Sequence, residues 1–225
     1  MRAGTWACAS TATRCRADVA TTVINYGNSN IFSVLNALDD IGEDVVIGAD
    51  PETVSRAERI ILPGVGAFGP AMARLTETGL AAALDDAVRK RGVPYLGICL
   101  GMQLMAQRGF EGGTATDGFG WVEGDVVALE PEPPHWRVPH MGWAIVGWDE
   151  GTPLAGSLQK DAAFYFCHSY HLASSEEPVC GVVDFHGTAA AALRSGSALG
   201  VQFHPERSGN NGLRLLENFL KWKPA

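Results

Sequence analysis

The sequence predicts an α/β fold in which helices flank a mixed, mostly parallel central sheet, with a smaller antiparallel sheet beside it. Two observations support this prediction. Up to about residue 112, apolar runs of strand length alternate with helical patterns, which is typical of a parallel, doubly wound sheet. After Gly112, short alternating segments separated by Pro, Gly and Asp dominate, which is typical of antiparallel strands.

The first half of the chain supplies the parallel part of this sheet. Residues 21–25 form the first predicted strand, and a helix over 30–41 follows because its apolar residues recur at helical spacing. The remaining predicted elements of this half are strands over 44–48, 59–62 and 94–98, a helix over 79–91, and a helix that begins at Leu100.

The second half supplies the antiparallel part, with predicted strands over 124–129, 144–147, 162–166, 179–183 and 189–194. A strand from Ser197 ends at His204, and an amphipathic helix over 212–222 follows. Because no repeat or linker divides it, we expect 21–225 to form one domain. Residues 1–20 are rich in Ala, Thr and Arg and lack the apolar segment of a secretion signal, so we expect a disordered extension there.

Composition limits the class of protein. A chain of 225 residues is long enough for one domain with a substantial core, and a net charge of −8 argues against nucleic-acid binding. Five cysteines are an odd number, and their spacings form no CxxC pair, which predicts reduced thiols in a cytoplasmic compartment. No apolar run is long enough to span a membrane, so no membrane association is expected.

Cys99 is the most informative residue. An apolar run ends in Gly97-Ile98-Cys99-Leu100-Gly101 and leads into a helical pattern, which is the layout of a nucleophile elbow with a thiol in place of the hydroxyl. The two glycines leave room for a tight strand-to-helix turn, and the N-terminus of a helix favours a thiolate. The alternative is a buried core cysteine, against which the two glycines argue.

His204 and Glu206 provide the second half of a catalytic arrangement. They follow an apolar strand in the run Val201-Gln202-Phe203-His204-Pro205-Glu206. In an extended segment, residues two apart point to the same side, so the carboxylate can hold one imidazole nitrogen while the other faces a nucleophile. The sequence therefore predicts a Cys-His-Glu triad.

Two other patterns, taken alone, would suggest dinucleotide binding and metal binding. The run from Gly64 to Gly69 matches the glycine-rich signature of dinucleotide-binding loops, but Pro70 follows it and no acidic residue is placed for a ribose. Four histidines could suggest a metal site, but no spacing among them matches one, so we expect neither a metal nor another cofactor. These histidines are His135, His140, His168 and His171.

Together these motifs resemble the class I (triad) glutamine amidotransferases. Four further stretches narrow the resemblance to the glutaminase subunits of imidazole glycerol phosphate synthases. They are Leu62-Pro63-Gly64-Val65-Gly66-Ala67-Phe68, Pro139-His140-Met141-Gly142-Trp143, Phe164-Tyr165-Phe166-Cys167-His168-Ser169-Tyr170, and Phe203-His204-Pro205-Glu206-Arg207-Ser208-Gly209. The resemblance covers about residues 22–222, nearly the whole chain.

The resemblance implies a flavodoxin-like class I amidotransferase fold and a glutaminase that forms glutamate and ammonia. The ammonia would pass to a (β/α)8-barrel cyclase subunit, which makes imidazole glycerol phosphate and AICAR in histidine biosynthesis in the cytoplasm. Two alternatives stay open. One is a paralogous glutaminase that feeds another synthase, such as one that amidates a sugar, and the other is a non-catalytic interaction subunit. The intact triad argues against the latter.

The resemblance also implies roles for individual residues. Backbone N–H groups near Gly64 and Val65, with that of Leu100, would form an oxyanion hole. The residues that would hold the substrate L-glutamine are Gly66, Gln103, Glu111, Ser169 and Tyr170. In the family Glu111 takes the substrate ammonium and Gln103 binds its carboxylate end, whereas the alternative for Glu111 is a solvated charge at a helix end.

The partner surface would be formed by Asn28, Asn30, His140, Met141, Trp143 and Arg207. Pro139 to Trp143 is expected to be a loop, and core packing is the alternative for Trp143. The chain departs from the family here: Asn25 and Ser29 stand where Asp and Gly are usual, Ala144 replaces Asn, and Arg207 replaces Lys. These departures bear on which synthase is the partner more than on glutamine hydrolysis.

Overall fold

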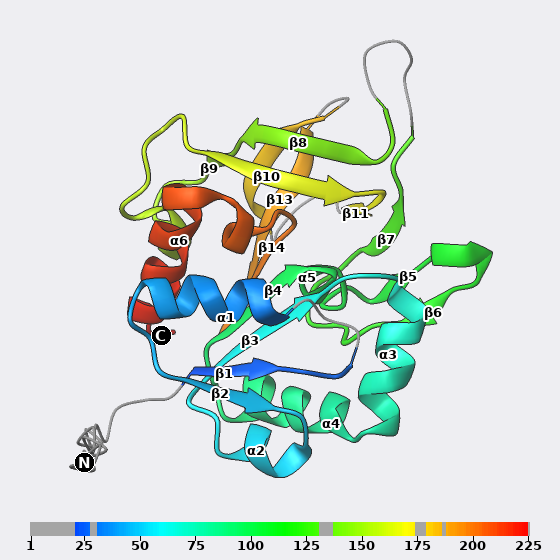
Figure 1. Ribbon diagram of the computed structural model, residues 1–225. Helices are drawn as coiled ribbons and strands as arrows, with labels where there is room; N and C mark the ends of the chain where they lie inside the picture. Colours follow the sequence, from blue (N-terminus) through cyan, green and yellow to red (C-terminus); the bar gives the residue numbers. More distant parts are fainter. Residues whose placement is uncertain (1–20, 28–30, 131–136, 174–178, 186–187, 225) are drawn as a thin grey trace, which may run out of the picture.

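The computed structural model describes residues 21–27, 31–130, 137–173, 179–185 and 188–224 (Figure 1). The expected extension 1–20 and the expected interface residues Asn28 and Asn30 lie outside these ranges.

Within the described residues, the centre of the fold is an eight-stranded sheet of order β2-β1-β3-β4-β14-β13-β12-β9. The strands from β2 to β14 are parallel, and β13, β12 and β9 continue the sheet in antiparallel pairing. Their bounds are β1 Thr21–Ile24, β2 Val45–Gly48, β3 Arg59–Gly64, β4 Tyr95–Cys99, β9 Gly147–Trp148, β12 Val179–Asp184, β13 Thr188–Ser195 and β14 Ala198–Val201. The predicted mixed, mostly parallel central sheet is confirmed.

Helices cover both faces of this sheet (Figure 1). On one face lie α1 (Ile31–Asp40) and α6 (Gly209–Lys221), and on the other lie α2 (Pro51–Ser55), α3 (Phe68–Glu77) and α4 (Leu80–Asp85), which a π-helical turn over Asp86–Lys90 extends. Successive residues of a strand point to opposite faces, so Ile60 and Leu62 of β3 pack into one core and Ile61 into the other. The central strands are therefore buried on both sides.

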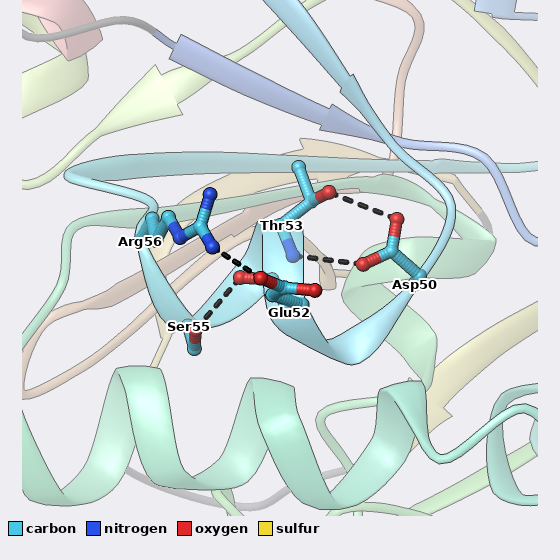
Figure 2. A network of polar contacts seen from close by, with 5 residues as sticks. All are labelled: Asp50, Glu52, Thr53, Ser55 and Arg56. Atoms are coloured by element: carbon cyan, nitrogen blue, oxygen red, sulfur yellow. Dashed lines mark hydrogen bonds and ion pairs between the residues drawn. The ribbon is translucent and has the colours of Figure 1, made fainter.

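The helix α2 is only five residues long, and side chains of the same segment stabilise it (Figure 2). Asp50 caps its N-terminus and accepts hydrogen bonds from Thr53 N and Thr53 Oγ1, both at 2.9 Å. The Ser55 hydroxyl donates to the Glu52 carbonyl at 2.7 Å, and Arg56 pairs with the Glu52 carboxylate.

Neither α2 nor α3 was expected from the sequence. In α3, Pro70 lies in the first turn, where its missing N–H costs nothing.

Two smaller sheets lie beside the main one, in place of the single antiparallel sheet that was expected. A four-stranded sheet has the order β11-β7-β5-β6, and its β5–β7 pair is parallel. A separate antiparallel ribbon joins β8 to β10. The strand bounds are β5 Arg108–Gly109, β6 Thr116–Asp117, β7 Asp125–Ala128, β8 His140–Ile145, β10 Ala163–His168 and β11 Tyr170–Ala173. The expected loop from Pro139 to Trp143 is thus wrong, because His140 to Trp143 pair with β10.

The backbone packs tightly at the turn from β4 into α5 (Leu100–Gln103). A Cβ on Gly97 would lie 2.4 Å from the Gly101 carbonyl oxygen, and a Cβ on Gly101 would lie 1.9 Å from the Leu62 carbonyl oxygen. The Tyr95 hydroxyl donates to the Gly101 carbonyl at 2.8 Å and fixes the turn from inside the core. Neither position has room for a side chain, so both must be glycine, as the elbow motif predicted.

We expect Gly101→Ala to lower the free energy of unfolding by about 3 kcal/mol, because the added methyl meets rigid backbone. Urea denaturation measures this loss. Gly147→Ala is the matched control, since a Cβ there makes ordinary contact with Val182 at 3.5 Å. Equal stability of the two variants would contradict this account of the turn.

Candidate active site

A cavity of about 430 Å³ lies at the carboxyl ends of β3 and β4, where open α/β sheets usually hold their ligands. The residues that line this cavity are far apart in the sequence. Its lining includes Val65, Gly66, Cys99, Leu100, Gln103, Glu111, Pro139, Cys167, His168, Ser169, Tyr170, His204 and Arg207. The nucleophile, base and glutamine-binding candidates named from the sequence thus reach one hollow, whereas Gly64 and Glu206 line a smaller hollow that also includes His204.

Cys99 ends β4 in a strained conformation. Its φ is 53° and its ψ is −107°, and it is the one non-glycine residue with positive φ in the described part of the chain. Such a backbone costs about 1–3 kcal/mol and persists only where the surroundings enforce it. The Gly97 and Gly101 contacts do so, and the thiol is left 8% exposed at the cavity.

The helix that follows Cys99 is short. α5 covers only Leu100–Gln103, and looser turns continue it to Ala106. The partial charge at the end of so short a helix is smaller than the elbow motif led us to expect. A thiolate here therefore needs other donors.

His204 and Glu206 meet as the sequence predicted, but by a different geometry. Strand β14 ends at Val201, and Pro205–Arg207 forms a 3-10 turn rather than extended chain. Within that turn, His204 Nδ1 lies 2.8 Å from Glu206 Oε1, and both side chains are buried. The Nδ1–H donates to the carboxylate, which leaves Nε2 for the Cys99 sulfur.

The charge state of His204 follows from these neighbours. Burial disfavours the imidazolium, but the hydrogen bonds to Cys99 and Glu206 and the negative charges on both groups outweigh burial and raise the pKa of His204 to about 10. The geometry therefore favours a protonated imidazole between a carboxylate and the sulfur.

Glu111 is tied to the start of α3 and is not a freely solvated charge. Its Oε2 accepts a hydrogen bond from Phe68 N at 2.7 Å, across 43 positions of sequence. The N-terminus of a helix favours a carboxylate, so this contact orients the side chain. Since Glu111 also lines the cavity, it places a negative charge at the cavity wall.

Gln103 lines the cavity but is bonded within the protein. Its Nε2 donates to the Tyr170 carbonyl at 2.8 Å and to Gln202 Oε1 at 3.0 Å. Both amide hydrogens are used, so the free atom is the oxygen, which accepts and does not donate. The expectation that Gln103 binds a substrate carboxylate is at odds with this geometry.

Gln202 was missed from the sequence, although it belongs to the motif that ends in His204. It is fully buried, and its Nε2 lies 3.7 Å from Cys99 Sγ. The available signal was a polar residue in an apolar strand, two positions before His204, the candidate base.

Comparison with known proteins agrees with this geometry. A family profile described as glutamine amidotransferase class-I matches residues 22–222. The HisH subunit of imidazole glycerol phosphate synthase from Caulobacter vibrioides is 42% identical over 209 residues, which cover 90% of this chain and 98% of that protein. The HisH subunit from Rhodopseudomonas palustris is 40% identical over 213 residues, with the same shares covered.

The chain belongs to the class-I glutamine amidotransferase family. The glutaminase domain of Trypanosoma brucei CTPS, solved with bound acivicin, shares this fold with a TM-score of 0.64 at 17% identity, over 92% of this chain and 96% of that chain. The predicted family and fold class are thus confirmed.

The outer surface of this amidotransferase carries an apolar row beside the cavity. Along β8, Met141, Trp143 and Ile145 are 61%, 59% and 56% exposed, and these alternate positions share one side of the strand. The guanidinium of Arg207 lies 4.7 Å from the centre of the Tyr165 ring, which in turn contacts Trp143. Solitary soluble proteins rarely expose such a row.

His140 does not belong to this surface, which corrects its predicted place at the partner interface. It is 9% exposed and is stacked between Phe166 and Phe185. Its Nδ1 lies 3.1 Å from His168 Nε2, while His168 Nδ1 lies 2.9 Å from the Tyr170 carbonyl. Because the carbonyl needs a donor, His168 carries its proton on Nδ1, and His140 donates to His168.

Neither histidine of this pair is charged in the fold. Burial lowers the pKa of His140 to about 4, and burial, with the nearby charge of His204, lowers that of His168 to about 3.

In the described residues, no group of three or more His, Cys, Asp or Glu side chains is placed to hold a metal ion. Among the helices that the structure describes, none has the length and apolar character needed to cross a membrane.

This pair predicts a loss of stability in acid. Below the ordinary histidine pKa of 6.5, the unfolded chain takes up protons that the fold excludes, so the free energy of unfolding falls as pH decreases toward about 4. His140→Phe removes one such site and keeps the ring packing. We expect it to flatten the decline between about pH 6.5 and pH 5 by up to about 1.4 kcal/mol per pH unit. Urea denaturation at several pH values tests this, and parallel curves for wild type and variant would contradict it.

Proposed function

We propose that this chain is the glutaminase subunit of an imidazole glycerol phosphate synthase. It hydrolyses L-glutamine to glutamate and ammonia, and the ammonia passes to a cyclase subunit that makes imidazole glycerol phosphate and AICAR in histidine biosynthesis. The observation that carries this proposal is the strained Cys99 at the cavity beside the His204–Glu206 pair, in a chain 42% identical to a HisH subunit.

The reaction follows from the placement of these groups. The Cys99 thiolate attacks the side-chain amide carbon of glutamine, and the oxyanion that forms is stabilised by the backbone N–H groups of Val65 and Leu100. The imidazolium of His204 gives its proton to the departing nitrogen, and ammonia leaves. His204 then takes a proton from water, which attacks the thioester and releases glutamate and the thiolate. Glu206 stabilises the imidazolium in both steps.

The remaining cavity residues suit the two charged groups of an amino acid. The Glu111 carboxylate, held in place by Phe68 N, accepts from the substrate ammonium, and the free oxygen of Gln103 is a second acceptor. Ser169 supplies a hydroxyl donor for the substrate carboxylate. Gly66 has a φ of 96°, which lets the loop pass close to the substrate.

The partner is proposed to be a (β/α)8-barrel cyclase that covers the row of Met141, Trp143 and Ile145. Burying such a row would shield the cavity mouth, so that ammonia leaves into the partner rather than into water. The similarity to HisH subunits favours this cyclase over a sugar-amidating synthase, and the complete triad argues against a silent interaction subunit. We place the complex in the cytoplasm as a heterodimer and expect it to need no cofactor.

Cys99→Ser should lower glutamine turnover in the assembled complex by at least about a thousandfold, because the hydroxyl is a far weaker nucleophile beside this base. Glutamate release measures turnover, and titration with the cyclase should give an unchanged dissociation constant. Cys180→Ser, which alters a buried thiol on β12 outside the cavity, is the control. Turnover above about a tenth of wild type in Cys99→Ser would exclude Cys99 as the nucleophile.

Arg207→Glu should weaken assembly by about 1 kcal/mol or more, because a planar guanidinium facing the partner suits a bidentate carboxylate pair. Calorimetric titration against the cyclase at low salt measures the change. Arg89→Glu makes the same charge change at an exposed position of the π-helical turn after α4, outside the cavity lining, and should leave the dissociation constant unaltered. An unchanged constant for Arg207→Glu would remove this residue from the interface.

A further inference from the structure

We infer that Gln202 is a further catalytic residue, whose side-chain amide donates a hydrogen bond to the Cys99 thiolate. Its Nε2 lies 3.7 Å from Cys99 Sγ, which is a normal distance for a hydrogen bond to sulfur. The side chain is fully buried, so water does not compete for this donor. The inference rests on the proposed role of Cys99 as the nucleophile.

The orientation of the Gln202 amide is fixed by its other contact. The Tyr170 carbonyl can only accept, so the Gln103 side chain must turn its nitrogen toward it, at 2.8 Å. The same nitrogen lies 3.0 Å from the Gln202 side chain, which must therefore present its oxygen. Gln202 then has only its nitrogen to turn toward Cys99. The relay from Tyr170 through Gln103 and Gln202 thus ends in a donor aimed at the sulfur.

The backbone holds the relay at the required place. Gln202 N donates to the Ala191 carbonyl at 2.9 Å, which attaches this residue to β13 just beyond the end of β14. Its side chain reaches the same sulfur as that of His204, two residues later. Cys99 is therefore approached by a neutral amide and by an imidazole from one segment of chain.

A neutral amide can donate a hydrogen bond to the sulfur in every step of the reaction, whereas the charge of His204 changes from step to step. The imidazole is charged when the thiolate attacks and neutral once it has protonated the leaving ammonia, whereas the amide keeps its dipole in every step. The four-residue α5 adds little stabilisation of negative charge. Gln202 accordingly stabilises the thiolate in the resting enzyme and again when the sulfur leaves the thioester.

The test is the rate at which iodoacetamide alkylates Cys99, followed by mass spectrometry over a range of pH. Gln202→Met removes the donor and keeps the length and burial of the side chain. We expect alkylation near pH 7 to be about tenfold slower than in wild type, because a thiolate without this hydrogen bond forms less readily. The deficit should close at alkaline pH, where the thiol is ionised in both proteins. A deficit that is equal at every pH, or no deficit, would overturn the inference.

Gln103→Met is the second variant and does not alter the donor itself. It frees the Gln202 amide to rotate, so we expect a smaller deficit near pH 7, and the double variant should be no slower than Gln202→Met alone. Additive deficits, or wild-type alkylation in Gln103→Met, would contradict the relay. Ser197→Ala removes a buried hydrogen bond to Val88 at the other end of β14 and controls for loss of stability.

Glutamine turnover by the Cys99→Ser complex separates the two proposals. If that complex still hydrolyses glutamine, the proposed function of the site fails. If it is inactive and Gln202→Met is alkylated like wild type, only the role of Gln202 fails.

Discussion

The contact on which the site depends is between the β4–α5 turn and the end of β3. Gly101 lies so close to the Leu62 carbonyl that no side chain fits between them, and Gly97 has no room for a side chain against the Gly101 carbonyl. This packing holds Cys99 at a φ of 53°, a conformation that an isolated chain would abandon. The burial of β3 and β4 on both faces supplies the rigidity that keeps the strain in place.

The electrostatics of the site depend on one charged imidazole among neutral ones. Glu206 and the sulfur raise the pKa of His204, whereas burial lowers the pKa values of His140, His168 and His171. The neutral His168 lines the cavity without adding a second positive charge that would compete for the thiolate. Glu111 lines the same cavity, so its carboxylate can attract the ammonium of a bound amino acid.

Local spacing explains what the sequence could predict. The elbow around Cys99 and the His204–Glu206 pair each lie within a few residues, so their chemistry can be inferred without knowing the fold. The buried position of His140 could not be inferred in this way, because the pairing of β8 with β10 decides which residues of this strand face outward. The contact from Phe68 to Glu111 and the joining of β12 and β13 to the main sheet are long-range, and no short pattern encodes them.

Gln202 marks the limit of such inference most clearly. Its sequence neighbours predict a buried strand position, and only the approach of Gln103 and Cys99 gives its amide a function. A buried polar residue is retained when each of its groups has a partner, and here both partners belong to other segments. Residues of this kind become visible only when the hydrogen bonds of the site are traced one by one.

The proposed hydrolysis of glutamine passes through a thioester on Cys99, which can be trapped. The direct measurement is rapid acid quenching of the complex during turnover of isotopically labelled glutamine, followed by peptide mapping. We expect a glutamyl label on the peptide that contains Cys99, and no such label in Cys99→Ser. Label on another residue, or turnover that leaves no label on Cys99 at any quench time, would contradict it.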